Sequence, residues 1–448
     1  MEKKSFQFPV RLLLLSSVLV LNGCSWLGLG KEEKTPLPGE RFSVLELQKS
    51  MTQAESTLKP ENLVIPAPWK NDYWTQAGGY PNHNLQNASL SETALKKIWS
   101  VSIGKGSNDK LPLTSQPVVY GGIVYTMDSR STVKAFDISK SKLIWETKIR
   151  PKTEDEDVIG GGLAITAGML YATNGFGELI AMDPQKGGIF WRTKLTATSR
   201  AAPSVLGDKI YILTLDNHLA AYDAATGKFL WKYEGLSESA SLIYAASPAI
   251  DNDIVIAPMS SGELTALRSE NGSVAWSDSL SPSMQTGGAS SLPDIAALPV
   301  IDKGRVFAIS YGGKFVSIDQ TTGQRIWTYE IGGAKNPWVS GNMIFFISSN
   351  AELVALSRDT GVLAWVKPLE SYDKDKSGIQ NSLAWNGPIM AGNRLIVTSA
   401  GESMIEISPR DGTLIRKVDL DFHVAIPPVV AGETLYLISS DGMLSAWK

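Results

Sequence analysis

The 448-residue sequence predicts an all-β protein, an eight-bladed β-propeller with four antiparallel strands in each blade. Three observations predict this fold. A phrase such as AAYDAATGKFLWK (residues 220–232) recurs along the chain, a proline precedes the end of most copies by a constant offset, and the last copy stops one strand short. A fixed internal period of this kind is the mark of a repeat architecture, so it decides the fold class before any single element does.

The recurring phrase ends on one position that is tryptophan in most copies. Successive copies lie 38 to 51 residues apart, close to the ~40–45 residues of a four-stranded propeller blade. The terminal positions are Trp145, Trp191, Trp231, Trp276, Trp327 and Trp365, with Arg416 in the seventh copy. Because a buried tryptophan removes ~150–250 Å² from water, we expect these side chains to dock each blade against its neighbour. Stacking on a ligand is the less favoured alternative.

A proline fixes the register of the repeat. The residues 28 positions before the terminal residue of each copy are Pro117, Leu163, Pro203, Pro248, Pro299, Pro337 and Pro388. Proline has no N–H group and is therefore suited to the start of a strand that has one unpaired edge. The constant offset beside variable gaps indicates a rigid unit with insertions between the units.

Each unit reads as four short strands. In the third copy these are residues 202–206, 209–215, 218–223 and 228–233, which are rich in β-branched and aromatic residues and separated by turn residues. A glycine before the last strand, Gly227 in this copy, suits a tight turn that needs a positive φ.

The ring is expected to close through both ends of the chain. The final copy stops at Lys448, before its fourth strand. Residues 96–103 (KKIWSVSI) form an isolated strand pattern that contains Trp99 and precedes the first complete unit. We therefore expect this strand to complete the last blade, so that residues 91–448 form the propeller.

The first 23 residues have the pattern of a signal peptide that is cleaved. Basic residues precede an apolar run at 12–21, which is too short to span a bilayer comfortably. The sequence LNGC (21–24) resembles the bacterial lipoprotein box, and this resemblance implies cleavage before Cys24 and lipidation of that residue. Ser25, in place of Asp, implies sorting to the outer membrane. An ordinary signal peptide with a chance cysteine is the alternative.

Residues 24–90 are not repetitive. The charged, Pro- and Gly-rich stretch 31–40 is typical of a tether that follows the lipidated cysteine. The aromatic, turn-rich stretch 69–83 is expected to pack on the outside of the ring.

The composition excludes several classes of function. The formal net charge is −3 and no basic stripe is present, so a nucleic-acid partner is not expected. One cysteine and three dispersed histidines offer no disulfide and no recognisable metal site. No catalytic motif is found, and no cofactor is predicted.

The pattern A-x-D-x-x-T-G-x-x-x-W, nearly complete at residues 221–231, resembles the tryptophan-docking repeat of PQQ-type propellers. That repeat occurs in quinoprotein alcohol dehydrogenases and in relatives that are not enzymes. The resemblance implies a vicinal cysteine pair near the cofactor of the dehydrogenases, and this chain has a single cysteine. The non-enzymatic interpretation is therefore favoured over a PQQ-dependent periplasmic dehydrogenase.

The repeat, the lipoprotein box and the tether together resemble the BamB family, the lipoprotein subunit of the outer-membrane β-barrel assembly machine. This resemblance implies a scaffold on the periplasmic face of the outer membrane that binds the periplasmic domains of a BamA-like pore subunit. It also implies a contact surface on two neighbouring connections, where Leu242 and Asp294 match the family's pattern while Ile243 and Ala296 depart from it. A generic envelope scaffold with another partner remains an alternative.

Overall fold

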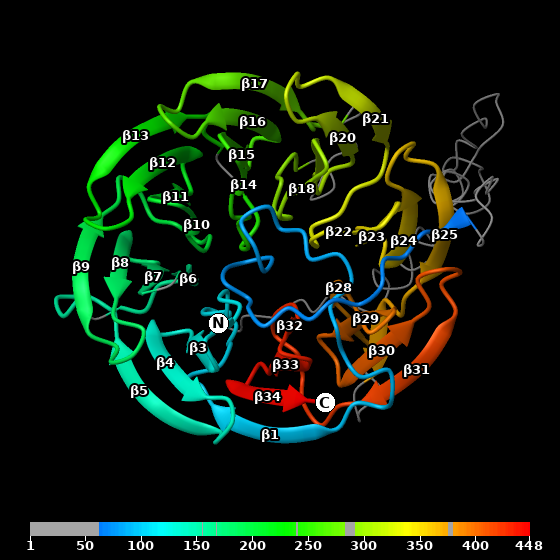
Figure 1. The fold of residues 1–448 in the computed structure, drawn as a ribbon, viewed down its shortest axis with the longest axis horizontal. Coiled ribbons are helices and arrows are strands. Elements are labelled where there is room, and N and C mark those ends of the chain that lie inside the picture. Colours follow the sequence, from blue (N-terminus) through cyan, green and yellow to red (C-terminus); the bar gives the residue numbers. More distant parts are fainter. Residues whose placement is uncertain (1–61, 155, 167, 239–240, 283–291, 375–379) are drawn as a thin grey trace, which may run out of the picture. The chain divides into compact units, whose positions relative to one another are not determined.

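Eight four-stranded antiparallel sheets surround a central axis in the computed structural model (Figure 1), which confirms the predicted eight-bladed propeller. The structure describes residues 62–448 except 155, 167, 239–240, 283–291 and 375–379. The predicted signal peptide, Cys24 and the tether at 31–40 lie outside the described residues. No helix within the described ranges is long and apolar enough to cross a membrane.

In seven of the eight blades, the innermost strand comes first in the chain and the outermost comes last. Seven blades are contiguous in sequence: β2 (Val118–Tyr120), β3 (Ile123–Met127), β4 (Thr132–Asp137), β5 (Lys142–Lys148); β6 (Gly161–Thr166), β7 (Met169–Asn174), β8 (Glu178–Met182), β9 (Ile189–Lys194); β10 (Ser204–Leu206), β11 (Lys209–Leu213), β12 (His218–Asp223), β13 (Phe229–Glu234); β14 (Ala249–Asp251), β15 (Ile254–Pro258), β16 (Glu263–Arg268), β17 (Val274–Ser279); β18 (Val300–Asp302), β19 (Arg305–Ile309), β20 (Phe315–Asp319), β21 (Arg325–Tyr329); β22 (Trp338–Ser340), β23 (Met343–Ile347), β24 (Glu352–Ser357), β25 (Leu363–Pro368); and β28 (Trp385–Ala391), β29 (Arg394–Ser399), β30 (Ser403–Ile407), β31 (Leu414–Asp419).

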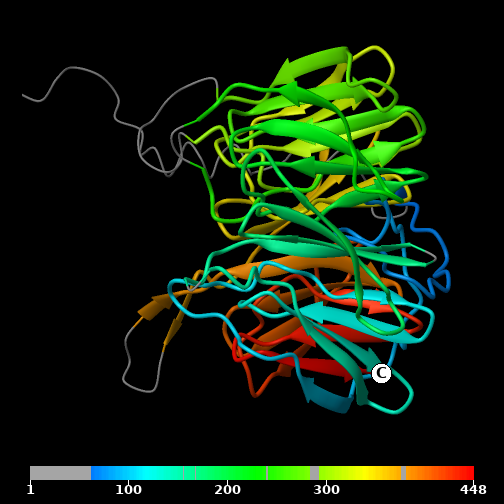
Figure 2. The ribbon, with the colours of Figure 1, turned by 90° about the vertical axis from the view of Figure 1, so that its left-hand side faces the viewer.

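The eighth blade joins the two ends of the described chain, as the sequence predicts. Its order is β1 (Lys97–Ser102), β34 (Met443–Trp447), β33 (Thr434–Ile438) and β32 (Val429–Ala431). Trp99 pairs with Ala446 in the antiparallel ladder, and the backbones of Lys96 and Lys448 exchange two hydrogen bonds. An additional hairpin, β26 (Tyr372–Lys374) with β27 (Gln380–Ser382), projects from one face of the ring (Figure 2).

Burial explains which strands of the repeat are continuous apolar runs and which are not. The second and third strands of a blade, such as β11 and β12, are buried on both faces between neighbouring blades, so their sequences are continuous apolar runs. The outermost strand β13 alternates between exposed and buried positions, because only one of its faces meets protein.

The repeated tryptophans dock onto the turn of the following blade. The indole Nε1 of Trp191 donates to Ala225 O at 2.9 Å, and its ring lies against Gly227, where a Cβ atom would come within 2.6 Å of the indole. The φ of Gly227 is 69°, so both the turn conformation and the indole require glycine. The same hydrogen bond to the next blade is made by Trp145, Trp231, Trp276, Trp327 and Trp365.

One sequence-based expectation is wrong: residues 69–83 do not pack on the outside of the ring. The segment 63–90, here called the plug, crosses one mouth of the central channel (Figures 1 and 2). It hydrogen-bonds to the innermost strand of every blade, or to the residue that follows that strand, at Val119, Ile165, Val205, Ile250, Ile301, Gly341, Met390 and Val430.

The plug has the apolar content of a core segment and not of a surface loop. Leu63, Trp74 and Leu85 are nearly inaccessible to solvent and belong to the largest hydrophobic cluster of the described residues. In a propeller the inner strands have one unpaired edge each, and the backbone of the plug satisfies part of those edges. The inner strands leave eight unpaired edges at the axis, and hydrogen bonding to these edges places residues 69–83 there instead of on the outer surface.

Candidate functional site

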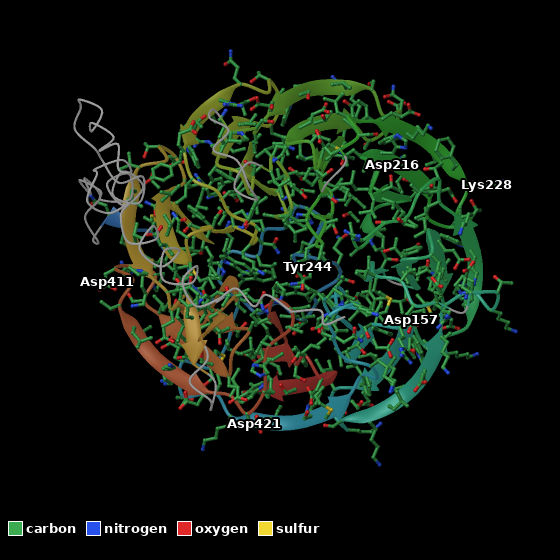
Figure 3. The ribbon with its side chains drawn as sticks, turned by 180° about the vertical axis from the view of Figure 1, so that it is seen from behind. Asp157, Asp216, Lys228, Tyr244, Asp411 and Asp421 are labelled. Atoms are coloured by element: carbon green, nitrogen blue, oxygen red, sulfur yellow. The ribbon has the colours of Figure 1, made fainter. Side chains whose placement is uncertain are left out.

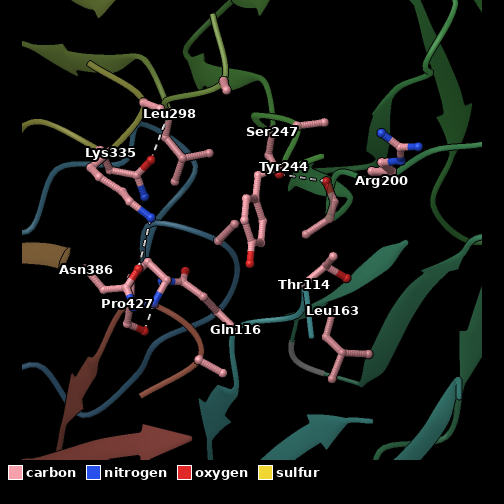
Figure 4. A pocket seen from close by; sticks show the side chains of 17 residues that line it. Thr114, Gln116, Leu163, Arg200, Tyr244, Ser247, Leu298, Lys335, Asn386 and Pro427 are labelled. Atoms are coloured by element: carbon pink, nitrogen blue, oxygen red, sulfur yellow. Dashed lines mark hydrogen bonds between the residues drawn. The ribbon is translucent and has the colours of Figure 1, made fainter. Parts of the chain in front are cut away.

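The connections between blades gather at the mouth of the channel opposite the plug. Each runs from the outermost strand of one blade to the innermost strand of the next, and the residues that precede the first-strand proline face the axis. They line a cavity of about 100 Å³ (Figure 4). Its floor includes Ala77 of the plug, so the channel is closed at one end and open at the other.

Two predicted partner-binding residues meet in this region. The backbone N–H of Leu242, in the connection from β13 to β14, donates to Asp294 Oδ2 at 2.7 Å, and Asp294 lies in the connection from β17 to β18. The Leu242 carbonyl accepts a 3.4 Å hydrogen bond from Arg200 Nη1. The connection that holds Leu242 is thus fixed between an acidic and a basic side chain from the two neighbouring connections.

The four predicted partner-binding residues differ in exposure. Ile243 is 49% exposed and Leu242 is partly buried, whereas Asp294 is 3% and Ala296 8% exposed. Burial raises the pKa of the Asp294 carboxyl to about 6, against the opposing effect of the Leu242 hydrogen bond. Asp294 and Ala296 therefore shape the connections, and Ile243 with its neighbour Tyr244 presents side-chain surface to solvent.

Tyr244 stands near the centre of the ring when the molecule is seen from the open mouth (Figure 3). It is 43% exposed and its ring points into the cavity (Figure 4). The ammonium of Lys335, in the connection from β21 to β22, lies 5.7 Å from the Tyr244 ring centroid. Lys335 Nζ also donates to Asn386 Oδ1 at 3.1 Å.

The lining of this cavity is cationic and otherwise neutral. Lys335 and Arg200 contribute two positive charges, and no Asp or Glu is found among the described lining residues. Burial lowers the pKa of the Lys335 ammonium. No group of three or more His, Cys, Asp or Glu side chains that could hold a metal ion exists in the described part of the chain.

The sequence-based interpretation overlooked the plug, Lys335, Arg200 and Tyr244. A signal for the cavity was available, because the residue directly before each first-strand proline faces the axis in several blades. These residues are Gln116, Ala202, Ser247, Leu298, Asn336 and Pro427. No comparable signal exists for the plug, since its contacts are made mainly by irregular backbone.

Comparisons with known proteins agree with the fold. Residues 152–367 match the family model described as "Outer membrane protein assembly factor BamB". An uncharacterized protein of Rickettsia prowazekii (strain Madrid E) is 30% identical over 276 residues, which are 60% of this chain and 65% of that protein. The outer membrane protein assembly factor BamB of Legionella pneumophila (strain Paris) is 28% identical over 204 residues, 45% of this chain and 50% of that protein. The matches thus span about half to two thirds of these relatives.

Solved structures show the same architecture. BamB from Moraxella catarrhalis superposes with a TM-score of 0.67 at 21% identity, covering 79% of this chain and 100% of that chain. Quinohemoprotein alcohol dehydrogenase from Comamonas testosteroni superposes with a TM-score of 0.64 at 14% identity, covering 87% of this chain and 82% of that chain. At these identities the likeness concerns the fold alone, and fold does not determine function.

Proposed function

We propose that this chain, a BamB-like β-propeller of the PQQ-repeat type, is a non-enzymatic scaffold subunit of an outer-membrane β-barrel assembly machine. It is anchored through lipidated Cys24 to the periplasmic face of the outer membrane. There it binds the periplasmic domains of a BamA-like pore subunit and assists the insertion of outer-membrane proteins.

One observation carries the proposal: the two connections that the family resemblance singles out lie in direct contact. Asp294 accepts the backbone N–H of Leu242 at 2.7 Å, so the two connections form one surface at the open mouth. The side chains of Ile243 and Tyr244 stand exposed beside this contact. Binding residues are commonly carried by loops on a rigid scaffold, and an interface of ordinary size requires ~800 Å² on each partner.

Site-specific photo-crosslinking in cells tests this surface. A photoreactive amino acid at position 243 or 244 is expected to capture the pore subunit, identified by mass spectrometry. The control position is 190, because Phe190 is 56% exposed and lies on β9, the outer strand of a different blade. Capture of only other envelope proteins from 243 and 244 would favour the alternative of a generic envelope scaffold.

The lipid anchor has its own test. Cys24→Ala is expected to abolish labelling with a fatty-acid analogue and to release the chain from outer-membrane fractions, because several acyl chains are needed for durable anchoring. Ser25→Ala is the matched control and is expected to stay labelled. Labelling of the Cys24→Ala chain would contradict the lipoprotein assignment.

The competing function is a quinone-dependent dehydrogenase, which the structural likeness to a quinohemoprotein favours. Two features speak against it. The sequence has one cysteine and so lacks a vicinal pair, and the axial cavity of about 100 Å³ is smaller than the ~300–1,000 Å³ of typical small-molecule pockets. Reconstitution with PQQ and calcium is expected to yield no dye-linked alcohol oxidation.

A further inference from the structure

The axial cavity contains a cation without an ionic partner. Lys335 Nζ donates one hydrogen bond, to Asn386 Oδ1, and lies over the face of the Tyr244 ring. No carboxylate of the described residues forms an ion pair with it. An ammonium carries three N–H donors, so at least one donor of Lys335 is unmatched by protein within the described structure. Lys335 is partly buried, and a partly buried ammonium is stabilised when its remaining donors find an acceptor.

A second cation lies across the cavity. Arg200 enters on the far side of Tyr244 from Lys335 (Figure 4). Its Nε is buried and has no hydrogen-bond partner in the described structure, and its Nη1 makes only the long bond to Leu242 O. Two under-satisfied cationic residues from different blades therefore belong to the lining of one recess.

The remaining walls of the recess define what fits between these charges. Polar and apolar side chains alternate around the recess: Asn386, Leu298 and Pro427 lie on the Lys335 side, and Thr114, Ser247 and Leu163 lie on the Arg200 side (Figure 4). The plug closes the recess from below through Ala77. A ligand must therefore enter from the open mouth and must be small.

We propose that this recess binds a small oxyanion, a carboxylate or a phosphate, held by Lys335 and completed by Arg200. An oxyanion would satisfy the free donors of Lys335 with charge-assisted hydrogen bonds, which are about twice as strong as neutral ones. When the ligand is a dicarboxylate, Arg200 would bind its second carboxylate, since the guanidinium matches the planar geometry of that group. This binding activity goes beyond the docking of a partner protein, and the recess shares Tyr244 with the proposed docking surface.

Isothermal titration calorimetry on the full-length chain in detergent micelles tests the proposal, with inorganic phosphate and glutarate as probes. Saturable binding of at least one probe is expected. Tighter binding of phosphate identifies a compact anion at Lys335, and tighter binding of glutarate identifies a dicarboxylate that reaches Arg200. Absence of saturable heat for both probes at millimolar concentration would overturn the proposal.

Variants locate the site. Lys335→Met is expected to weaken binding by about tenfold or more, as loss of a charge-assisted hydrogen bond predicts. Lys335→Arg keeps the charge and is expected to retain most of the affinity. Lys140→Met is the control, because Lys140 is an exposed lysine on the outer turn of the first blade.

Folding of the variants can be checked independently. Because Lys335 has no ionic partner in the described structure, Lys335→Met is expected to unfold at a temperature no lower than the parent chain. If Lys335→Met folds and binds both anions with the parental affinity, the anions bind elsewhere and the proposal is wrong. Arg200→Met is expected to weaken glutarate more than phosphate.

Discussion

Arg416 stands where every other blade carries tryptophan, and the surrounding residues change with it. The residue that pairs with the tryptophan in the third strand is small: Ala446, Ala135, Ala181, Ala221, Ala266, Ser317 or Ala355. Opposite Arg416 it is Glu406. Glu406 is fully buried and forms ion pairs with Arg394 Nε at 2.9 Å and Arg416 Nη1 at 2.8 Å.

This buried triad predicts a large cost for removing its anion. Glu406→Gln leaves Arg394, itself 2% exposed, without a counter-charge, so we expect a loss of about 3–5 kcal/mol in the free energy of unfolding. Urea denaturation measures the change, and Glu402→Gln, at the exposed position directly before β30, serves as the control.

The same site offers a compensating variant. Arg394→Met, Glu406→Ala and Arg416→Trp together install the residues that other blades use, with methionine taken from Met343 at the equivalent ladder position. Replacing a buried ion pair by well-packed apolar residues is often neutral or stabilising. A triple variant as unstable as Glu406→Gln alone would show that the cost comes from packing and not from the unpaired charge.

His83 makes the stability of the plug depend on acidity. Its Nδ1 donates to Pro299 O at 2.7 Å, and burial lowers the pKa of its ring from 6.5 to about 4. The folded state therefore resists protonation that the unfolded chain accepts, so its stability is complete above pH 6.5 and declines as the pH falls toward 4. The two pKa values correspond to a loss of about 3 kcal/mol.

Urea midpoints measured between pH 7 and pH 4 test this linkage. His83→Gln cannot titrate and is expected to lose less stability over that window than the parent chain, by up to about 3 kcal/mol. His423→Gln, outside the plug, is the control and is expected to follow the parent. Identical acid dependence of the parent and His83→Gln would contradict the assignment.

At the scale of the elements, the four-stranded units were predictable and the plug was not. Three sequence features indicate the four-stranded unit: the apolar runs, the constant proline offset and the turn glycine before Trp231. All three arise within one repeat, because the strands that pair in a blade lie close together in sequence. Trp74 instead pairs its backbone with Val119, and the next contact of the plug falls on another blade. Contacts of this kind leave no period in the sequence. The cavity was partly predictable, since Lys335 lies two residues before Pro337 in the repeat.

The plug is expected to depend on one buried side chain. Trp74 is 1% exposed, so Trp74→Ala should cost about 3–5 kcal/mol locally. Hydrogen–deuterium exchange is expected to rise across residues 70–88 and to change little in the central strands of the blades. Trp69→Ala is the matched control, because Trp69 lies in the same segment but is 39% exposed. Equal exchange in both variants would show that the backbone bonds alone hold the plug.

At the scale of the whole molecule, the stability of the ring depends on its closure. Each blade buries its faces against two neighbours, so an open ring would expose two apolar faces at once. The closing blade is held by β34, which lies between β33 and β1 and contributes buried Leu444, Ala446 and Trp447. The largest hydrophobic cluster joins this blade to the plug. The blade that closes the ring and the plug that closes the channel therefore share one hydrophobic core.

Deletion of residues 443–448 is expected to abolish cooperative unfolding of the whole ring. The deletion removes β34, one of the two middle strands of the last blade, so β1 loses the strand with which it pairs and the faces of the adjoining blades become exposed. Thermal unfolding and limited proteolysis measure the effect. Deletion of Lys448 alone is the control and is expected to be mild, because it removes one backbone pair with Lys96 and an exposed side chain. A six-residue deletion that still unfolded in one transition near the parental temperature would mean that closure contributes little and that each blade is stable through its neighbours alone.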